Sequence, residues 1–243
     1  MSWVLILGAK SDIAKAVARE FAKNGYNLHL VGRNISELSD FASDLKVRYG
    51  VQVSLGELDV LEIEKQEEFY NSLSPKPDGV ITAVGFLPDQ KEAENSINLT
   101  VKTINTNFTA LATFLNIVAN DFEKRKSGFI IGISSVAGDR GRAKNFIYGS
   151  AKAGFTAYLS GLRNRLFKSN VRVITVKPGF VYTKMTKHMD LPKRLTAYPD
   201  QIAKDIYNGF IKGKDVIYTP KKWFFIMCVI KHIPERIFKR LDI

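Results

Sequence analysis

The chain has 243 residues, 45% of them hydrophobic, which favours one domain with one buried core. Its single cysteine excludes an internal disulfide and a multi-cysteine metal site, and no two of its three histidines have ligand spacing, so we expect no bound metal. The net charge of +12 is uneven, because residues 1–120 carry a net charge of −4 and residues 121–243 a net charge of +16. The second half therefore favours an anionic partner, such as nucleic acid, a phosphate-bearing substrate or an anionic membrane surface.

Strand-like and helix-like segments alternate along the chain. We predict strands at residues 3–7, 27–32, 51–60, 78–85, 128–135, 171–179 and 215–220. Helices are predicted between them at residues 11–24, 35–49, 62–73, 92–125, 147–168 and 199–212. This alternation of apolar strands and helices predicts an α/β fold with a Rossmann-like, doubly wound parallel sheet of seven strands in a single domain. Such sheets bind ligands beyond the carboxyl ends of their strands.

The first predicted strand leads into "LGAKSDIAKA", residues 7–16, which is typical of a turn that holds phosphate before a helix. The turn keeps only one glycine, Gly8, to make the sharp bend. We expect Ser11 to cap the helix and Asp12 to suit the positive end of the helix dipole. Asp12 should face away from a bound pyrophosphate, which would meet Lys10 and the backbone amides.

The strongest chemical signal is "YGSAK", which places Tyr148 and Lys152 on the same face of a predicted helix. An ammonium group beside a phenol lowers the pKa of the phenol, and such a tyrosine can exchange a proton with a carbonyl oxygen. Ser135, at the end of a predicted strand, can hydrogen-bond the same oxygen. Asn107 lies in a predicted helix, where its side-chain amide could hold a water molecule behind the lysine.

These residues resemble the short-chain dehydrogenase/reductases over nearly the whole chain. The resemblance is carried by Gly8, "LDV" at 58–60, Gly85, Asn107, "ISSVAG" at 133–138, "YGSAK" and "KPGFVYT". It implies a catalytic group of Asn107, Ser135, Tyr148 and Lys152, with Tyr148 as the general acid that protonates a ketone. It also implies a nicotinamide cofactor bound by Gly8, Lys10, Ser11, Asp12, Ile13, Arg33, Asp59, Val60, Gly85, Tyr148, Lys152, Pro178, Gly179, Val181 and Thr183.

The end of the second predicted strand indicates which nicotinamide cofactor is used. NAD is usually selected by an acidic residue at this point, but the sequence reads Gly32-Arg33. Arg33 could pair with the 2′-phosphate of NADP, and Lys10 would add a second cation. The sequence therefore favours NADPH, with NADH as the alternative.

Basic residues surround the predicted active site. Arg140, Arg142 and Lys144 follow Ser135, and Lys184 lies in a segment at about 180–198 that closes over the substrate in this family. Arginine suits phosphate because its donors can engage two oxygens at once. We predict that these four residues contact a substrate with both phosphate and hydrocarbon, while a merely solvated lid is the alternative.

Residues 221–243 are predicted to form a basic, aromatic, amphipathic helical tail after the nucleotide-binding domain of residues 1–220. The apolar core of this tail is too short to span a bilayer, and no signal peptide is apparent. The tail fits a helix that lies in an anionic membrane surface, or one that packs on another subunit of a dimer or tetramer. We therefore expect a cytoplasmic protein, with peripheral contact at the inner membrane face if the tail binds lipid.

A narrower resemblance is to the decaprenylphosphoryl-2-keto-ribose reductases, through "SSVAGDRGRAKNF", "FIYGSAKAG" and "IKHIPERIFKRL". It implies reduction of a 2-keto-pentose on a polyprenyl phosphate, after a flavin-dependent oxidase partner has made the ketone. Two other interpretations stay open. One is a soluble reductase of small ketones, acyl thioesters or steroids. The other is a non-catalytic nucleotide-binding scaffold, although the sequence outside the tail lacks the basic, aromatic helix that would favour nucleic acid.

Overall fold

The computed structural model describes residues 2–187 and 189–241, so His188 of the predicted lid and residues 242–243 of the predicted tail lie outside the described residues. Seven strands form one parallel sheet in the order β3-β2-β1-β4-β5-β6-β9. Their bounds are Trp3–Leu7 (β1), Asn27–Gly32 (β2), Val53–Glu57 (β3), Gly79–Thr82 (β4), Gly128–Ile133 (β5), Val171–Pro178 (β6) and Val216–Thr219 (β9). The predicted fold is confirmed, and its strand order reverses between β1 and β4, where such sheets bind ligands.

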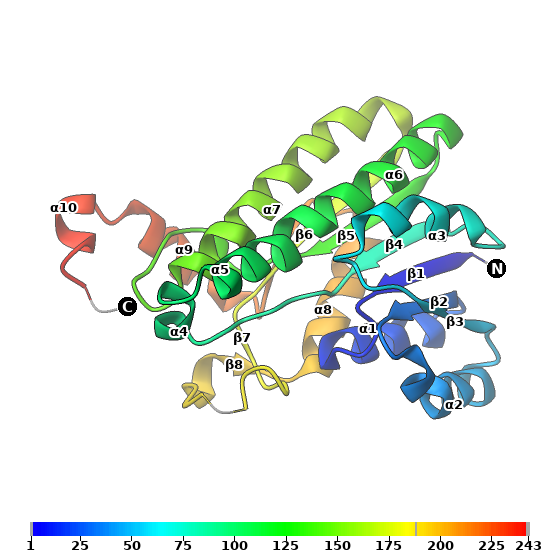
Figure 1. Ribbon diagram of the computed structural model, residues 1–243, viewed down its shortest axis with the longest axis horizontal. Coiled ribbons are helices and arrows are strands. Elements are labelled where there is room, and N and C mark those ends of the chain that lie inside the picture. The colour runs from blue at the N-terminus through cyan, green and yellow to red at the C-terminus, as the bar shows by residue number, and fades with distance from the viewer. Residues whose placement is uncertain (1, 188, 242–243) are drawn as a thin grey trace.

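Helices cover both faces of the sheet (Figure 1). One face carries α1 (Asp12–Lys23), α2 (Ser39–Tyr49) and α8 (Pro199–Ile211), and the other carries α3 (Gln66–Ser72), α6 (Ala110–Arg125) and α7 (Phe146–Leu166). Strand β1 shows how one segment serves both layers, because Val4 and Ile6 belong to the first core while Leu5 and Leu7 belong to the second. This period of two is the geometry of a strand buried on both sides.

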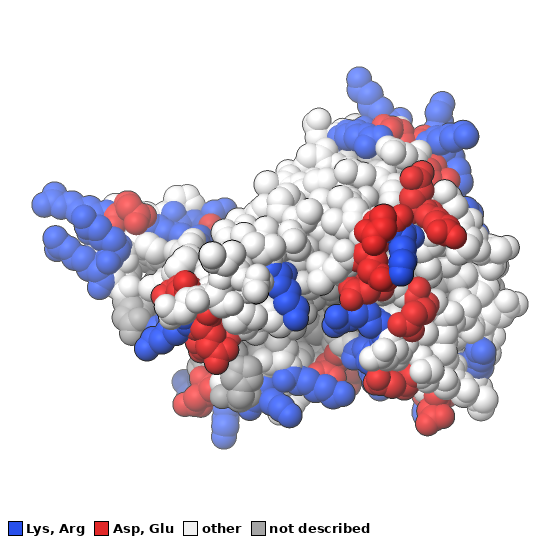
Figure 2. Space-filling model, viewed as in Figure 1, with Lys and Arg blue, Asp and Glu red and all other residues white. Residues whose placement is uncertain are grey.

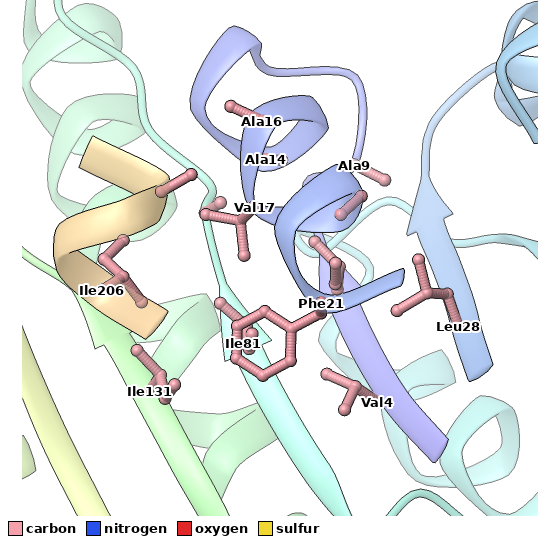
Figure 3. Packing of buried hydrophobic residues seen from close by; sticks show 14 of the residues in the cluster. Val4, Ala9, Ala14, Ala16, Val17, Phe21, Leu28, Ile81, Ile131 and Ile206 are labelled. Atoms are coloured by element: carbon pink, nitrogen blue, oxygen red, sulfur yellow. The ribbon is translucent and has the colours of Figure 1, made fainter. Parts of the chain in front are cut away.

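Helix α1 brings the predicted phosphate turn to the sheet. Its small and apolar side chains, among them Ala14, Val17 and Phe21, lie over β1 and β4 and beside Ile206 of α8 (Figure 3). Ser11 caps the helix as predicted, since its hydroxyl oxygen accepts a hydrogen bond from the Ala14 amide at 3.1 Å. The helix start is therefore fixed against the carboxyl end of β1.

Several predicted elements differ from the observed ones, such as the strand predicted at 78–85, which is observed as Gly79–Thr82, and two further differences have a clear cause. The predicted helix 92–125 is divided into α4 (Gln90–Glu94), α5 (Ile97–Ile104), a π-helical turn (Asn105–Thr109) and α6. Ser96 starts a new helix by accepting a hydrogen bond from Leu99 at 3.2 Å. The predicted strand 51–60 is shorter, because β3 is an edge strand that pairs only with β2, and the chain leaves the sheet after Glu57.

Short elements complete the described part of the chain. Strands β7 (Phe180–Val181) and β8 (Thr196–Ala197) pair within the predicted lid, and the predicted tail forms α9 (Lys222–His232) and α10 (Glu235–Phe238). Single 3₁₀ turns lie at Ile35–Leu38, Ile63–Lys65, Val136–Gly138, Phe167–Ser169 and Lys193–Leu195. Among the described residues, none of the helices is both long and apolar enough to cross a bilayer.

Helix α9 packs against the domain. Trp223 and Met227 are buried in a cluster with Val136, and Phe180 and Leu195 of the lid lie against the same cluster. The Trp223 indole Nε1 donates a hydrogen bond to the Leu195 carbonyl at 3.1 Å. The inner face of α9 is therefore part of the structure around the lid, while its outer face exposes Phe225 and Val229.

Candidate active site

Three of the four predicted catalytic residues lie around one cavity. Ser135 follows β5 and begins the 3₁₀ turn at Val136–Gly138, and Tyr148 and Lys152 lie one turn apart on α7. All three line a cavity of about 340 Å³. The Ser135 hydroxyl oxygen accepts a hydrogen bond from the Ala137 amide at 3.1 Å, which fixes its position at the start of the turn.

Burial controls the charges of Tyr148 and Lys152. It raises the pKa of Tyr148 to about 12, against a smaller lowering by a hydrogen bond with Ser135, and it lowers the pKa of Lys152 to about 7. The Lys152 amine lies 5.7 Å from the centre of the Tyr148 ring and donates to the Ile133 carbonyl at 3.3 Å. The predicted lowering of the pKa of Tyr148 by Lys152 is thus wrong for this structure, because desolvation disfavours both charged forms. Tyr148 keeps its proton, which is the form that a general acid needs.

Asn107 has a different arrangement from the predicted one. Its side chain is fully buried in the π-helical turn. Its amide nitrogen donates to the carbonyls of Phe86 and Thr103 at 2.7 and 2.8 Å, and its amide oxygen accepts from the Phe86 amide at 3.2 Å. The amide hydrogens are used by the protein, so the side chain holds the loop after β4 to α5 instead of donating to a water molecule behind Lys152.

A second cavity, of about 460 Å³, continues from the first over the ends of β1, β2 and β4. Predicted cofactor residues line one or both cavities: Gly8, Lys10, Ser11, Asp12, Ile13, Arg33, Asp59, Val60, Gly85, Pro178, Gly179, Val181 and Thr183. The topology therefore brings together residues from the whole length of the predicted nucleotide site. Lys102 of α5 also lines this cavity, and the sequence pattern did not single it out.

The phosphate turn fits a nucleotide. Gly8 has a φ of +83°, and a Cβ atom at this position would lie only 2.8 Å from the Val84 side chain and 2.9 Å from the backbone of residue 83. A larger residue would therefore fill the turn at the switch point of the sheet. The α1 amides that follow form the positive helix end that binds phosphate in such folds.

The two cations predicted to select NADP lie at this cavity, each with an acidic partner. Arg33 pairs with Asp59 at 3.4 Å and has a side chain that is 65% exposed. Lys10 pairs with Glu37 at 2.8 Å, and this interaction lowers the pKa of the Glu37 carboxyl. Exposed ion pairs of this kind contribute little to stability, so both side chains are available to exchange partners.

Asp12 links the phosphate turn to the lid. Its carboxylate accepts a hydrogen bond from the Lys184 backbone amide at 2.7 Å, across 172 positions of the chain. Both residues line the catalytic cavity. The Asp12 carboxylate is thus directed at the lid backbone, and the expectation that it faces away from a bound pyrophosphate stays a prediction.

The four predicted substrate residues divide into two pairs. Arg142 and Lys184 line the catalytic cavity, whereas Arg140 and Lys144 are outside the set that lines it. Arg140 instead binds the predicted tail. Its guanidinium donates to the carbonyls of Ile230 and Ile233 at 2.7 and 2.5 Å and lies over the Phe238 ring.

The assignment of Arg140 to the substrate is wrong because the turn after Ser135 directs this side chain away from the cavity. Arg140 also pairs with Glu235 of α10 at 2.8 Å, so it joins the active-site turn to both helices of the tail. Lys144 is exposed and lies on the loop before α7.

Sequence reasoning missed Asn145, which lines the cavity three residues before Tyr148. This interval of about one helical turn from Tyr148 could have indicated it. Sequence reasoning also missed a network around Asp139. Lys177 and Tyr218 both bind the buried Asp139 carboxylate, and this network fixes the end of the Ser135 turn. No local sequence pattern relates Asp139, Lys177 and Tyr218, because they come from a loop, from β6 and from β9.

Comparison with known proteins decides the class. The short chain dehydrogenase family matches residues 2–193. The chain belongs to the short-chain dehydrogenase family. It is an oxidoreductase of that family, and the Ser135, Tyr148 and Lys152 arrangement lies within the matched segment.

Relatives of similar length support this assignment. The chain is 32% identical over 244 residues to an uncharacterized oxidoreductase of Streptomyces coelicolor, covering 98% of this chain and 95% of the relative. It is 31% identical over 241 residues to an uncharacterized oxidoreductase of Mycobacterium tuberculosis, covering 98% and 96%. Its fold is similar to that of a short-chain dehydrogenase from Sphingobium yanoikuyae in complex with NADPH, with a TM-score of 0.83, 24% identity and 97% of each chain covered.

Proposed function

We propose that the protein is an NADPH-dependent reductase that converts a ketone into an alcohol, with Tyr148 as the general acid. The observation that carries this proposal is the convergence of Ser135, Tyr148 and Lys152 on one cavity. NADPH, when bound, supplies the hydride. The Ser135 hydroxyl holds the substrate oxygen, and the Tyr148 hydroxyl gives it a proton as negative charge develops there.

Lys152 has two roles in this proposal. Its buried amine, with a pKa lowered to about 7, exchanges a proton near neutral pH and so can restore the proton that Tyr148 loses. It also holds the ribose beside the nicotinamide. Asn107 is a positioning residue in this proposal. It binds the loop after β4 to α5, and α5 in turn packs against α7, which carries Tyr148 and Lys152.

The preference for NADPH rests on the cations at the second cavity. Arg33, Lys10 and Lys102 all line it. A 2′-phosphate brings two negative charges to this place, and Arg33 and Lys10 would exchange their acidic partners for it. NADH lacks this phosphate and would leave the cations with their present partners.

Replacement of Tyr148 by phenylalanine tests the general acid. Tyr148→Phe should lower kcat by at least about 100-fold, the usual contribution of a general acid, while the affinity for NADPH stays nearly unchanged. Tyr158→Phe is the matched control, because Tyr158 lies on the same helix but its hydroxyl donates to Asn116 and to the Ala112 carbonyl. Substantial turnover by Tyr148→Phe in stopped-flow or steady-state assays would refute the assignment.

For the physiological substrate we propose a keto-sugar carried on a polyprenyl phosphate, produced by a flavin-dependent oxidase partner. Apolar side chains of Leu87, Phe180, Met185 and Met189 line the same cavity as Arg142. A cavity with an apolar wall and a cation suits a substrate that has both hydrocarbon and phosphate. Coupled turnover with a purified oxidase and lipid-phosphopentose tests this substrate directly.

The tail supports a position at the membrane surface. Phe225 and Val229 are 60% and 67% exposed on the outer face of α9. Lysine and arginine side chains gather at the end of the molecule that α10 forms (Figure 2), where Arg236, Lys239 and Arg240 are exposed. Apolar and basic groups together bind anionic lipid surfaces.

Vesicle sedimentation tests this membrane contact. The protein should bind vesicles of anionic phospholipid and release them at high salt, and Phe225→Asp with Val229→Asp should abolish binding. Phe167→Asp is the control, because Phe167 is 81% exposed but lies at the far end of α7. The absence of vesicle binding by the wild-type protein would refute membrane contact.

A soluble reductase of small ketones, acyl thioesters or steroids is the second candidate. The same exposed face of α9 favours it, because a dimer or tetramer would also cover Phe225 and Val229. Light scattering combined with the vesicle assay distinguishes the two, since a change of oligomeric state in Phe225→Asp, together with no vesicle binding by the wild-type protein, favours this candidate.

A further inference from the structure

Arg142 is a cation at the active-site cavity, and none of the described carboxylates forms an ion pair with it. Its Nε atom is buried and has no hydrogen-bond partner among the described residues. Asp139 is the acid that acts on it, but the two oxygens of Asp139 already bind Lys177 and the Tyr218 hydroxyl, the latter at 2.7 Å. The Nε donor is therefore buried without a partner while Asp139 shares its charge between Lys177 and Arg142, which is costly unless a ligand oxygen accepts from this donor.

Asn145 presents a complementary atom beside it. Its side-chain oxygen is also buried and without a partner among the described residues. The backbone joins the two positions, since the Asn145 amide donates to the Arg142 carbonyl at 3.1 Å and the Gly149 amide donates to the Asn145 carbonyl at 2.7 Å. Arg142, Asn145 and Tyr148 thus follow one another at intervals of three residues, and all three line the same cavity.

The charges on the cavity wall favour an anion. Lysine and arginine side chains contribute most of the charged groups there, and the carboxylate of Asp12 is the acid among the described lining residues. That carboxylate already accepts a hydrogen bond from the Lys184 amide. An arginine donor binds a carboxylate or phosphate oxygen, whereas an amide oxygen accepts a hydrogen bond from a hydroxyl.

We propose that Arg142 and Asn145 form a substrate subsite that binds an anionic oxygen group through the guanidinium and a neighbouring hydroxyl through the amide oxygen. This inference rests on the ketone reductase activity proposed above and narrows its substrate to ketones that carry a carboxylate or phosphate, with a hydroxyl group as an additional contact. Asn145 is the residue immediately before α7, and Arg142 precedes it in the turn that leads into this helix. Because all three side chains line one cavity, the anionic group and the carbonyl that Tyr148 protonates belong to the same bound substrate.

Two pairs of ketones test the subsite and distinguish its anion. Dihydroxyacetone phosphate and dihydroxyacetone differ by a phosphate, and 4-oxopentanoate and its methyl ester differ by a carboxylate charge. With NADPH, wild-type enzyme should have a higher kcat/KM for the charged member of at least one pair. Arg142→Gln should lower that value by about 10- to 100-fold, as expected for loss of a hydrogen bond between charged groups, and leave the neutral member within about twofold.

Two further variants sharpen the result. Asn145→Asp places a carboxylate beside Arg142 and should also remove the preference for the charged ketone. Arg165→Gln is the matched control, because Arg165 pairs with Glu123 outside the cavity and its loss should change neither pair. Equal effects of Arg142→Gln on charged and neutral ketones, or no preference in the wild-type enzyme, would overturn the subsite.

A binding measurement separates this inference from the proposed activity. Calorimetry with NADPH-loaded Tyr148→Phe protein should detect dihydroxyacetone phosphate or 4-oxopentanoate, and the added Arg142→Gln substitution should weaken that binding by about tenfold or more. If the wild-type enzyme reduces no ketone but this binding persists, the proposed function fails and the anion subsite stands. If ketones are reduced and the binding is insensitive to Arg142, the subsite fails alone.

Discussion

Replacement of Lys152 by methionine should remove catalytic activity and raise the free energy of unfolding. The Lys152 side chain is buried, and burial lowers its pKa from 10.5 to about 7. At about 1.36 kcal/mol per pKa unit, the charged amine destabilises the folded protein by roughly 4–5 kcal/mol. Methionine has a similar shape and no charge, so Lys152→Met should stabilise the cofactor-free protein at neutral pH while abolishing its turnover.

The stability difference between Lys152→Met and the wild-type protein should depend on pH. Because the pKa of Lys152 is lower in the folded protein, the unfolded chain binds more protons between pH 7 and 10.5, and wild-type stability rises with pH across this window. The advantage of Lys152→Met should therefore shrink by about 3 kcal/mol from pH 7 to pH 9.5. Tyr148 remains neutral over this range, since burial raises its pKa to about 12.

Urea unfolding at pH 7, 8.25 and 9.5 without NADPH measures the difference. Loss of the 3.3 Å hydrogen bond to the Ile133 carbonyl costs the same at each pH and cancels from the slope. Lys46→Met on α2 is the control, because Lys46 is exposed and its replacement should leave the pH profile unchanged. Parallel profiles for wild type and Lys152→Met would refute the reasoning that burial sets the charge of this amine.

Two further substitutions test the cofactor site and the packing of the tail. Arg33→Ala should weaken NADPH binding by about tenfold or more and NADH binding far less, as cofactor fluorescence would show, and equal losses would reject a 2′-phosphate contact. Gly179→Ala places a Cβ atom within the space of the Trp223 indole and should lower the free energy of unfolding by about 1–3 kcal/mol. The same change made in a Trp223→Ala background should cost much less, and an equal cost in both backgrounds would show that the clash is not its cause.

The sheet could be predicted because its strands are short apolar runs separated by glycine, proline and polar segments. Buried strands need residues such as Val4 to Leu7 on both faces, and this pattern stands out in the sequence. The division of the helix at 92–125 could not be predicted in the same way. Ser96 is an ordinary cap signal, but the π-helical turn at Asn105–Thr109 depends on hydrogen bonds from Asn107 to the distant Phe86.

In the active site, too, local spacing could be predicted from the sequence, whereas contacts with distant segments could not. The four-residue spacing of Tyr148 and Lys152 is enough to place both side chains on one face of a helix. Arg140 and Arg142 are two residues apart in sequence, yet one binds the tail and the other lines the cavity. The directions of the two side chains depend on the turn after Ser135 and on α9, which packs beside that turn. The sequence around residues 140–142 does not show that α9 lies there.

Charge shifts were also beyond sequence reasoning. A lysine one turn from a tyrosine is expected to favour the phenolate, but burial opposes both charges and raises the pKa of Tyr148 instead. The outcome depends on how completely the two side chains leave water. Spacing alone gives no measure of that burial.

The position of Trp223 sets the length of the connection between β9 and α9. Each residue turns an α-helix by about 100°, so one residue inserted at 220–221 would rotate Trp223 away from Gly179 and the lid. The same rotation would turn Phe225 and Val229 away from the outer face of α9, where both are now exposed. Point substitutions on the outer face leave the packing of Trp223 intact, whereas insertions before α9 would misalign the inner and outer faces of the helix together.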